Sequence, residues 1–225
     1  MLSIIIVSYN TSKLLDDCLE SITRHEPDAE VIVVDNGSDD DSVEMVRRSH
    51  PTVRLIDAGE NLGFANANNR GIAASTGDFV ILLNSDTVLE DDSLSRCVSR
   101  MNADKTLGAL SPSLIDMQGK PQRAYHAFPS LAKRWKQAFT KHEVKLPEPG
   151  SYGWLAGTAL MIRRAALDDI GGKLDSHYWM YWEDADTSAE LLEHGWRVEE
   201  YTGAHVRHYG GASGGGPDAI RRADL

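Results

Sequence analysis

Three apolar, strand-like runs of the chain each end in a short polar stretch that could bind a metal or a phosphate. The stretches are Ser8-Tyr9-Asn10, Asp35-Asn36-Gly37-Ser38 and Asn84-Ser85-Asp86. Mg²⁺ or Mn²⁺ bound to a diphosphate needs few protein ligands, because phosphate oxygens and water fill most of its coordination sphere. The carboxylate of Asp86 is therefore a candidate metal ligand. A plain turn is the alternative for Asp35 and Asp86, since Asp and Asn are common turn residues.

A second group joins aromatic residues to carboxylates. Tyr178-Trp179-Met180-Tyr181-Trp182 is followed by Glu183, Asp184 and Asp186, at the predicted start of a helix. Acids in the first turn stabilise a helix through its macrodipole, and this alone is an alternative explanation for them. Aromatic faces beside a carboxylate also suit a sugar, and a carboxylate at a partly apolar site can act as a general base near neutral pH. These acids are therefore candidate catalytic residues.

Two histidines, His205 and His208, precede a Gly-rich stretch late in the chain, His-Tyr-Gly-Gly-Ala-Ser at 208–213. A histidine in this setting could close over a diphosphate or complete the coordination of a metal. A structural role is the alternative. The residues alone leave open which of the two histidines is functional.

The first hundred residues alternate strand and helix patterns, which predicts a mainly parallel sheet with helices on both faces. The β-branched run from Ile4 to Val7 is typical of a strand buried on both faces, and Asn10 or Thr11 is expected to cap the next helix. Ligands of such sheets bind at the carboxyl ends of the strands, so the three polar stretches are expected to line one crevice. The expected strands span 3–9, 30–34, 53–56 and 79–83, and the expected helices 14–22, 42–48, 64–74 and 94–101.

The second half of the chain is less regular. Strands are expected at 108–115, 196–201 and 205–209, an apolar stretch lies at 153–162, and helices are expected before Gly171-Gly172 and from Glu183 to His194. Residues 126–149 contain several prolines and basic residues but no clean period. We expect the basic residues from Lys133 to Lys145 to meet anionic lipid headgroups or a polyprenyl diphosphate, with a solvated loop as the alternative.

Composition excludes several classes of protein. The chain has 225 residues, of which 41% are hydrophobic, and this suits one large domain or two small ones. A net charge of −11 is not that of a nucleic-acid-binding protein. Cys18 and Cys97 lie in helix-like stretches and are expected to be buried, and so few cysteines suggest neither a disulfide framework nor a Cys-rich zinc site. No signal peptide or run of roughly 20 apolar residues is visible, so we expect a cytoplasmic protein.

The loop after the first strand argues against a dinucleotide site and against a nucleotidyltransferase. Its residues, Ser8 to Ser12, contain none of the glycines of the G-x-G-x-x-G dinucleotide motif, and the chain has no G-x-x-x-x-G-K-[ST] loop. A nucleotidyltransferase would also need a Gly-rich, basic loop at this point. The sequence therefore disfavours both a dinucleotide site and a nucleotidyltransferase.

Taken in order, these stretches resemble glycosyltransferase family 2, whose members are inverting enzymes of the GT-A fold. Each stretch is modest alone, but six in the same order are specific, and the resemblance covers residues 1 to about 213. The chain is most similar to the bacterial rhamnosyltransferases, which build cell-surface polysaccharide on lipid-linked acceptors. The matching stretches span 7–10, 33–38, 61–71, 83–87, 154–163 and 182–186.

The resemblance implies a role for each candidate residue. Asp184 matches the catalytic base, with Glu183 as the alternative. Asp86 stands where the family's Asp-x-Asp motif binds Mg²⁺ or Mn²⁺, and His208 is the late histidine that reaches the metal or the diphosphate. Because Asn84 replaces the first Asp of that motif, the number of protein ligands stays open. The implied nucleotide-binding residues are Ser8, Tyr9, Asn10, Asp35, Asn66, Arg70, Asn84 and Ser85. The implied acceptor and sugar residues are Trp154, Gly157, Thr158 and Trp182.

The resemblance also implies the architecture and the reaction. A single GT-A domain at 1–213, with a nucleotide-binding half at 1–103 and an acceptor-binding half at 104–213, is expected to precede a flexible tail at 214–225. The expected reaction is inverting transfer of L-rhamnose from dTDP-rhamnose to a glycan or a polyprenyl-diphosphate-linked acceptor, with peripheral contact at the inner face of the membrane. A UDP-hexose or UDP-N-acetylhexosamine donor, and a non-catalytic sugar-nucleotide binder, are the alternatives.

Overall fold

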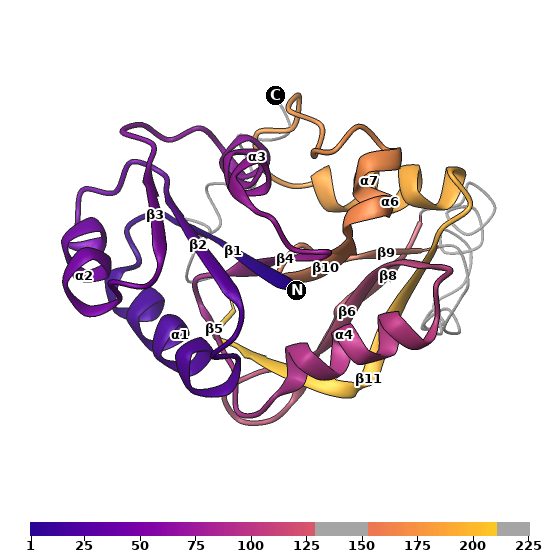
Figure 1. Cartoon of the computed structure of the whole chain (residues 1–225), viewed down its shortest axis with the longest axis horizontal. Helices are drawn as coiled ribbons and strands as arrows, with labels where there is room; N and C mark the ends of the chain where they lie inside the picture. The colour runs from indigo at the N-terminus through magenta and orange to yellow at the C-terminus, as the bar shows by residue number, and fades with distance from the viewer. Residues whose placement is uncertain (129–152, 211–225) are drawn as a thin grey trace, which may run out of the picture.

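The computed structural model describes residues 1–128 and 153–210, and strands alternate with helices in its first half (Figure 1). Each strand and helix predicted for this half is present, with ends close to those expected. The elements are β1 (Leu2–Ser8), α1 (Ser12–His25), β2 (Glu30–Asp35), α2 (Ser42–Ser49), β3 (Arg54–Asp57), α3 (Phe64–Ala74), β4 (Phe79–Asn84) and α4 (Ser93–Ala103).

β1 lies at the centre of the parallel part of the sheet because its side chains are apolar on both faces. It pairs in parallel with β2 on one side and β4 on the other, with Ile5 opposite both Ile32 and Leu82. Ile4 and Ile6 pack into one apolar core and Ile5 into another, all fully buried. Each such side chain contributes about 1.5–3 kcal/mol through burial, so these residues fix β1 between two helical layers.

Helices cover both faces of the sheet, as Figure 1 shows. α1, α2 and α4 share one core, which includes the fully buried Cys18 and Cys97. The prediction that both cysteines are buried is thus confirmed. α3, α6 (Arg164–Asp169) and α7 (Glu183–Glu193) supply the other core, with Ala65, Leu167 and Leu191 among its members.

Beyond β4 the sheet contains strands of both directions. β10 runs antiparallel to β4 and β6, whereas β11 runs parallel to β6 and antiparallel to β5. The order β3-β2-β1-β4-β10-β6-β11-β5 is therefore parallel up to β4 and mixed after it, and β8 and β9 form a separate small sheet. The remaining strands are β5 (Thr87–Val88), β6 (Leu107–Ile115), β7 (Pro121–Gln122), β8 (Tyr125–Ala127), β9 (Gly153–Leu155), β10 (Ala159–Arg163) and β11 (Arg197–His208).

β11 is one strand where the sequence predicts two, at 196–201 and 205–209, and the prediction of two strands is wrong. The pairing with β6 shifts register between Tyr201 and His205 and then continues to Arg207. Thr202 and Gly203 are exposed at this irregularity. In the sequence these two residues are typical of a break between strands. In the structure, pairing with β6 before and after the irregularity keeps the chain extended.

Two predicted segments, the basic stretch at 133–145 and the tail at 214–225, lie outside the described residues. Within 1–128 and 153–210, none of the helices has the length and apolar character needed to cross a membrane.

Candidate active site

Buried hydroxyl groups join the ends of β1 and β4. Thr11 Oγ1 lies 3.0 Å from Ser8 Oγ and 3.0 Å from Ser85 Oγ. Ser8 and Ser85 are fully buried, and Thr11 is nearly so. Thr11 occupies the predicted N-cap position of α1, but its side chain makes no capping hydrogen bond, because its hydroxyl bonds the two serines instead. The structure thus brings Ser8 and Ser85 together as buried supports of the site.

The loop after β1 is tied to the loop after β2 through Asn10. Asn10 has a left-handed φ of 53°, a conformation that Asn tolerates better than most residues. Its Oδ1 accepts the N–H of Asp39 at 2.7 Å, and its own N–H donates to Ser38 Oγ at 2.9 Å. Tyr9 and Asn10 are both exposed, so these two predicted nucleotide-binding residues lie at an accessible surface.

Asp35 closes a turn at the end of β2. Its Oδ1 accepts the N–H of Ser38 at 2.9 Å, and its Oδ2 accepts the hydroxyl of Ser38 at 2.6 Å. Only 1% of Asp35 is exposed. These contacts match the turn alternative that the sequence left open, and contact between Asp35 and a nucleotide base stays a prediction.

Asp86 and His208 lie together where β4 ends and β11 ends. His208 Nε2 is 3.4 Å from Asp86 Oδ1, and the N–H of Tyr209 donates to the carbonyl of Asp86 at 3.0 Å. Adjacent ligands of an octahedral cation, each at about 2.1 Å from the metal, are about 3 Å apart. A carboxylate oxygen and an imidazole nitrogen at this separation therefore fit a shared Mg²⁺ or Mn²⁺.

The two residues are fewer ligands than a site built from protein alone requires. Across residues 1–128 and 153–210, no group of three or more His, Cys, Asp or Glu side chains is arranged to hold a metal. The pair suits a cation whose remaining ligands are phosphate oxygens and water.

Asp184, at the start of α7, is oriented by two backbone N–H groups. Gly157 donates to its Oδ2 at 2.9 Å and Ala185 to its Oδ1 at 2.8 Å. Burial nevertheless raises the pKa of the Asp184 carboxyl above its ordinary value. A carboxylate with this combination of fixed orientation and raised pKa suits a general base.

Glu183, the neighbouring acid, is more deeply buried. Only 4% of it is exposed, and its Oε2 has no hydrogen-bond partner among the described residues. Burial, followed by the charge of Asp184, raises the pKa of Glu183 to about 7. The structure thus distinguishes the two acids that the sequence left as alternatives, because backbone donors hold both oxygens of Asp184 whereas Oε2 of Glu183 has no partner among the described residues.

A backbone hydrogen bond connects the Asp86 and Asp184 regions. Asn84 N–H, two residues before Asp86, donates to the carbonyl of Thr158 at 3.0 Å. The preceding residue of this same loop, Gly157, is the donor to Asp184. Both acids therefore belong to one edge of the sheet, beside the β4–β10 pair.

The loop before α7 has a strained backbone. Tyr181 and Trp182 have left-handed φ values of 70° and 73°, which cost non-glycine residues about 1–2 kcal/mol each. The loop is anchored at Trp179, whose carbonyl accepts the N–H of Phe64 at 2.7 Å. A Cβ on Gly63 would lie 2.5 Å from that carbonyl oxygen, so the close approach requires glycine there. The side chains of Trp179, Tyr181 and Trp182 are exposed.

His126 was missed by the sequence analysis as a site residue. Its ring stacks on Trp154, with the centroids 4.3 Å apart and the planes at 16°, because β8 and β9 place the two residues opposite each other. Burial lowers the pKa of His126, and the charge of Asp184 opposes this effect. A stacked aromatic pair thus lies within electrostatic reach of the candidate base. The pairing of β8 with β9 spans a long sequence separation, so no local signal could have revealed it.

Two predicted nucleotide-binding residues on α3 are not joined to the others by a hydrogen bond in the described part of the chain. The amide of Asn66 donates to the carbonyl of Leu62 at 3.2 Å, one turn earlier in the chain. Arg70 lies further along α3, and its side chain is exposed.

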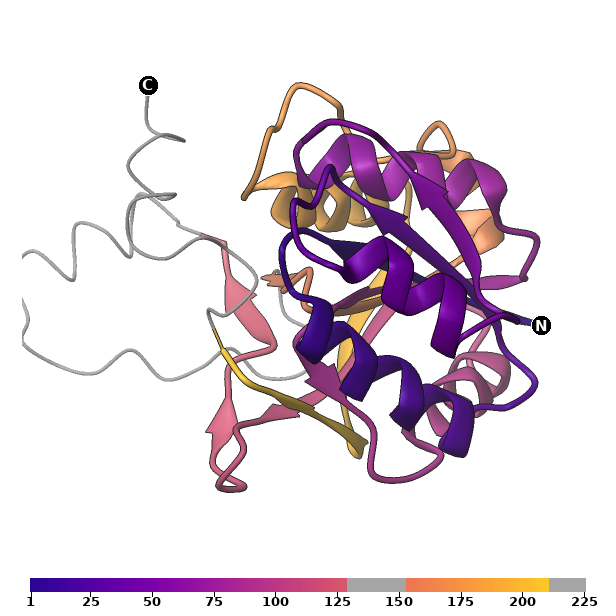
Figure 2. The same ribbon diagram turned by 90° about the vertical axis from the view of Figure 1, so that its left-hand side faces the viewer.

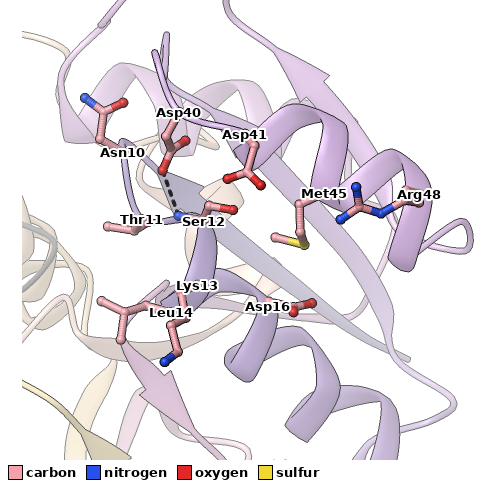
Figure 3. Close-up of a pocket in the computed structure, with 10 residues that line it drawn as sticks. All are labelled: Asn10, Thr11, Ser12, Lys13, Leu14, Asp16, Asp40, Asp41, Met45 and Arg48. Atoms are coloured by element: carbon pink, nitrogen blue, oxygen red, sulfur yellow. Dashed lines mark hydrogen bonds between the residues drawn. The ribbon is translucent and has the colours of Figure 1, made fainter.

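An open pocket of about 540 Å³ lies between the first turns of α1 and α2 (Figure 3). Asp40 is at its rim, where its Oδ2 accepts the N–H of Ser12 at 2.9 Å. Asn10 is the one predicted site residue that lines this pocket, whereas Asp86, Asp184 and His208 do not. The pocket therefore borders the loops expected to hold the nucleotide and is distinct from the candidate metal ligands and the candidate base.

Comparison with protein families gives one match over most of the chain. The model of Glycosyl transferase family 2 matches residues 3–171.

Curated relatives agree with this match. The chain is 29% identical to an N-acetylglucosaminyl-diphospho-decaprenol L-rhamnosyltransferase of Mycobacterium tuberculosis, over 93% of this chain and 76% of that protein. It is 26% identical to a poly-beta-1,6-N-acetyl-D-glucosamine synthase of Staphylococcus epidermidis, over 88% of this chain but only 45% of the synthase.

Solved structures share the fold. A mannosyltransferase from Pyrobaculum calidifontis, solved with GDP-Man and Mn²⁺, superposes with a TM-score of 0.70 at 19% identity, over 99% of this chain and 61% of that one. TarS residues 1–349 of S. aureus, solved with UDP, give a TM-score of 0.67 at 18% identity, over 92% of this chain and 59% of TarS. This chain thus spans about three fifths of these two structures. The α/β fold predicted from the sequence is confirmed.

Proposed function

Because the chain belongs to glycosyltransferase family 2, we propose that it is an inverting, metal-dependent enzyme that transfers a sugar from a nucleotide sugar to an acceptor hydroxyl. The observation that carries this proposal is the hydrogen bond between Asn84 and Thr158, which joins the end of β4 to the loop that holds Asp184. One edge of the sheet thereby carries an acid suited to binding a cation and an acid suited to accepting a proton. An in-line displacement needs both groups, one on each side of the reacting carbon.

Asp184 would take the proton from the acceptor hydroxyl. Gly157 and Ala185 each donate to one of its oxygens, and each oxygen keeps a lone pair for a further donor. Its raised pKa makes it a stronger base than an exposed Asp. As the proton moves to Asp184, the acceptor oxygen bonds to the anomeric carbon, and the bond to the nucleoside diphosphate breaks on the opposite face. The configuration at that carbon therefore inverts.

Asp86 and His208 would hold Mg²⁺ or Mn²⁺. When bound, the cation supplies Lewis acidity that neutralises charge on the departing diphosphate, an effect worth several kcal/mol. The protein holds the two ligands in place through β11, which pairs His208 with Thr87 of β5, next to Asp86. The N–H of Tyr209 then fixes the backbone of Asp86 from the same strand end.

The aromatic residues around Asp184 would bind the acceptor and the transferred sugar. Trp154 is stacked on His126, and Trp182 is exposed directly before the two acids of α7. Sugar rings present C–H faces that pack on aromatic rings. Gly157 and Thr158 shape the same side because their backbone atoms bond Asp184 and Asn84.

The donor we propose is dTDP-L-rhamnose, and the acceptor a glycan on a polyprenyl diphosphate. Support comes from the relative in Mycobacterium tuberculosis, whose name specifies an L-rhamnosyltransferase acting on a decaprenol-linked sugar. A UDP-hexose or UDP-N-acetylhexosamine donor is the second candidate, favoured by the similarity to the poly-N-acetylglucosamine synthase. Cytoplasmic placement with peripheral membrane contact through residues 133–145 stays a prediction, because those residues lie outside the described part of the chain.

A donor panel tests the proposed function. The protein is incubated with Mn²⁺, a polyprenyl-diphosphate-linked N-acetylglucosamine and, in turn, dTDP-L-rhamnose, UDP-glucose, UDP-N-acetylglucosamine or GDP-mannose. We expect transfer with inversion, fastest from dTDP-L-rhamnose. Faster transfer from a UDP-sugar would replace the donor but keep the reaction. Nucleotide-sugar binding without transfer to any acceptor would support the non-catalytic alternative and contradict the proposal.

A further inference from the structure

The hairpin of β6 and β7 reaches the candidate cation site through Gln122, a residue without a role in the reaction described above. β6 lies between β7 and β11, so that Leu114 of β6 is opposite both Gln122 and Val206. Figure 2 shows this hairpin beside the end of β11. From this position the side chain of Gln122 extends across to His208, the last residue of β11.

Gln122 contacts His208 at two points, and these contacts assign the proton on the imidazole ring. The amide nitrogen of Gln122 is 3.1 Å from the backbone carbonyl oxygen of His208, and its Oε1 is 2.7 Å from His208 Nδ1. A backbone carbonyl can only accept, so the nitrogen end of the amide must face it. The other end is then the oxygen, which also only accepts. The proton of the His208 ring is therefore on Nδ1, where it donates to Gln122.

The position of this proton determines what the ring presents to Asp86. A neutral imidazole with its proton on Nδ1 has a lone pair on Nε2. Nε2 is the atom that lies 3.4 Å from Asp86 Oδ1. The Gln122 contact thus turns Nε2, the nitrogen whose lone pair a neutral ring offers to a cation, toward the carboxylate.

We propose that Gln122 is a positioning residue for the divalent-cation site, because it fixes the His208 ring with Nε2 toward Asp86. This inference rests on the proposed function, in which Asp86 and His208 hold the cation. Metal-binding histidines usually donate their other N–H to a nearby acceptor, which sets both the tautomer and the ring orientation. Here the acceptor comes from a separate hairpin that also bonds the backbone of the same histidine. Gln122 itself does not touch the cation.

Mn²⁺ affinity measured by calorimetry, in the presence of a nucleoside diphosphate, tests this inference without reference to turnover. We expect Gln122→Leu to weaken Mn²⁺ binding by about 10–100-fold, the usual effect of losing such a partner. Gln118→Leu is the matched control, because Gln118 lies on the same hairpin but has an exposed side chain, and it should bind Mn²⁺ as the wild type does. Thermal unfolding without metal checks that Gln122→Leu is folded.

A double-mutant cycle separates positioning from general damage to the hairpin. His208→Ala should weaken Mn²⁺ binding, and adding Gln122→Leu to His208→Ala should cause almost no further loss. An equal loss from Gln122→Leu in both backgrounds would overturn the inference, as would wild-type affinity in Gln122→Leu. A wild-type protein that binds no Mn²⁺ would overturn both the inference and the metal dependence in the proposed function. Normal metal binding without sugar transfer would contradict the proposed function but leave the inference intact.

Discussion

The ends of β1 and β4 and the start of α7 contribute to the same edge of the sheet. Their buried polar groups differ in how fully they are hydrogen-bonded. At β1 and β4, the buried hydroxyls of Ser8, Thr11 and Ser85 bond one another. At α7, the buried Oε2 of Glu183 has no hydrogen-bond partner among the described residues. The residue before it, Trp182, has a left-handed backbone.

The difference indicates that the hydroxyls of Ser8, Thr11 and Ser85 stabilise the fold, whereas Glu183 and the loop before it are retained at a cost in stability. A buried, mutually bonded hydroxyl group stabilises the fold, whereas a buried carboxylate without a partner costs free energy once it is charged. Strained backbone and unsatisfied groups persist where function requires them. Substitutions of Thr11 and of Glu183 should therefore change the stability of the fold in opposite directions.

Among the substitutions that probe this comparison, the largest expected effect is on activity, at the candidate cation site. Asp86→Ala should lower the transfer rate about 100-fold or more, because the lost charge stabilisation is worth several kcal/mol and each 1.36 kcal/mol is a factor of ten. Steady-state assays over a range of Mn²⁺ concentrations measure it, with Asp57→Ala, an exposed acid at the end of β3, as the control. Full activity of Asp86→Ala at every Mn²⁺ concentration would remove Asp86 from the metal site.

Glu183→Gln should stabilise the protein, and the gain should depend on pH. Because the pKa of Glu183 is raised from 4.5 to about 7 in the folded state, the folded protein binds more protons than the unfolded chain between these values. The free energy of unfolding therefore falls as pH rises through this window, by about 3 kcal/mol at most. Gln cannot ionise, so the variant avoids the loss.

Chemical denaturation at pH 4.5 and at pH 8 measures the stability difference between Glu183→Gln and the wild type. We expect a small difference at the lower pH and the full difference at the higher one. Glu20→Gln, at an exposed position of α1, is the control and should show no such change. A Glu183→Gln variant that is less stable than the wild type at pH 8 would show that the Glu183 carboxylate has a partner.

Thr11→Val, between the ends of β1 and β4, should have the opposite effect on stability. The change keeps the shape of the side chain but leaves the hydroxyls of Ser8 and Ser85 without their shared partner. We expect a loss of about 1–3 kcal/mol, the cost of unsatisfied buried polar groups. Urea unfolding measures it. Unchanged stability would mean that the hydroxyl chain is not part of the scaffold.

The smallest expected effect is at the strained loop. Trp182→Asn should stabilise the fold by about 1 kcal/mol relative to Trp182→Ala, because Asn adopts the left-handed conformation more readily than Ala does. Both variants lose the exposed indole, so their difference isolates the backbone. Both should bind the acceptor more weakly, seen as a raised KM for acceptor. Equal stability of the two variants would argue against strain at this residue.

Local patterns in the sequence were sufficient to predict the parallel half of the fold. The β-branched run of β1 requires burial on both faces, and the helical spacing in α1 requires one apolar stripe, so both elements follow from periodicity. Asp86, His208 and Asp184 were predicted because polar residues at strand ends and at a helix start contradict the apolar pattern around them. The convergence of the ends of β1, β2 and β4 follows from the rule that parallel strands end at one edge of a sheet, whereas the contact of Asp86 with His208 depends on the pairing of β11 with β5.

Features that depend on pairing between distant segments could not be predicted. The stack of His126 on Trp154 requires β8 to pair with β9, and the contact of Gln122 with His208 requires β6 to lie between two other strands. Glu183 and Asp184 are adjacent acids in the sequence, and only the fold shows that backbone donors hold both oxygens of Asp184 but leave Oε2 of Glu183 without a partner among the described residues. Asp35 could not be interpreted from its residue type either. An Asp at a strand end suits ligand binding as well as a turn, and the structure shows the turn.

The most direct test of the account is the activity of Asp184→Asn beside Asp186→Asn, an acid of the same helical turn, with donor binding measured for both. Asn keeps the shape of Asp but accepts no proton. We predict that Asp184→Asn lowers transfer about 10²–10⁴-fold, the usual contribution of a general base, while binding of the nucleotide sugar stays close to that of the wild type and Asp186→Asn stays active. Normal turnover by Asp184→Asn would contradict the assignment of the base and with it the shared site at this edge of the sheet.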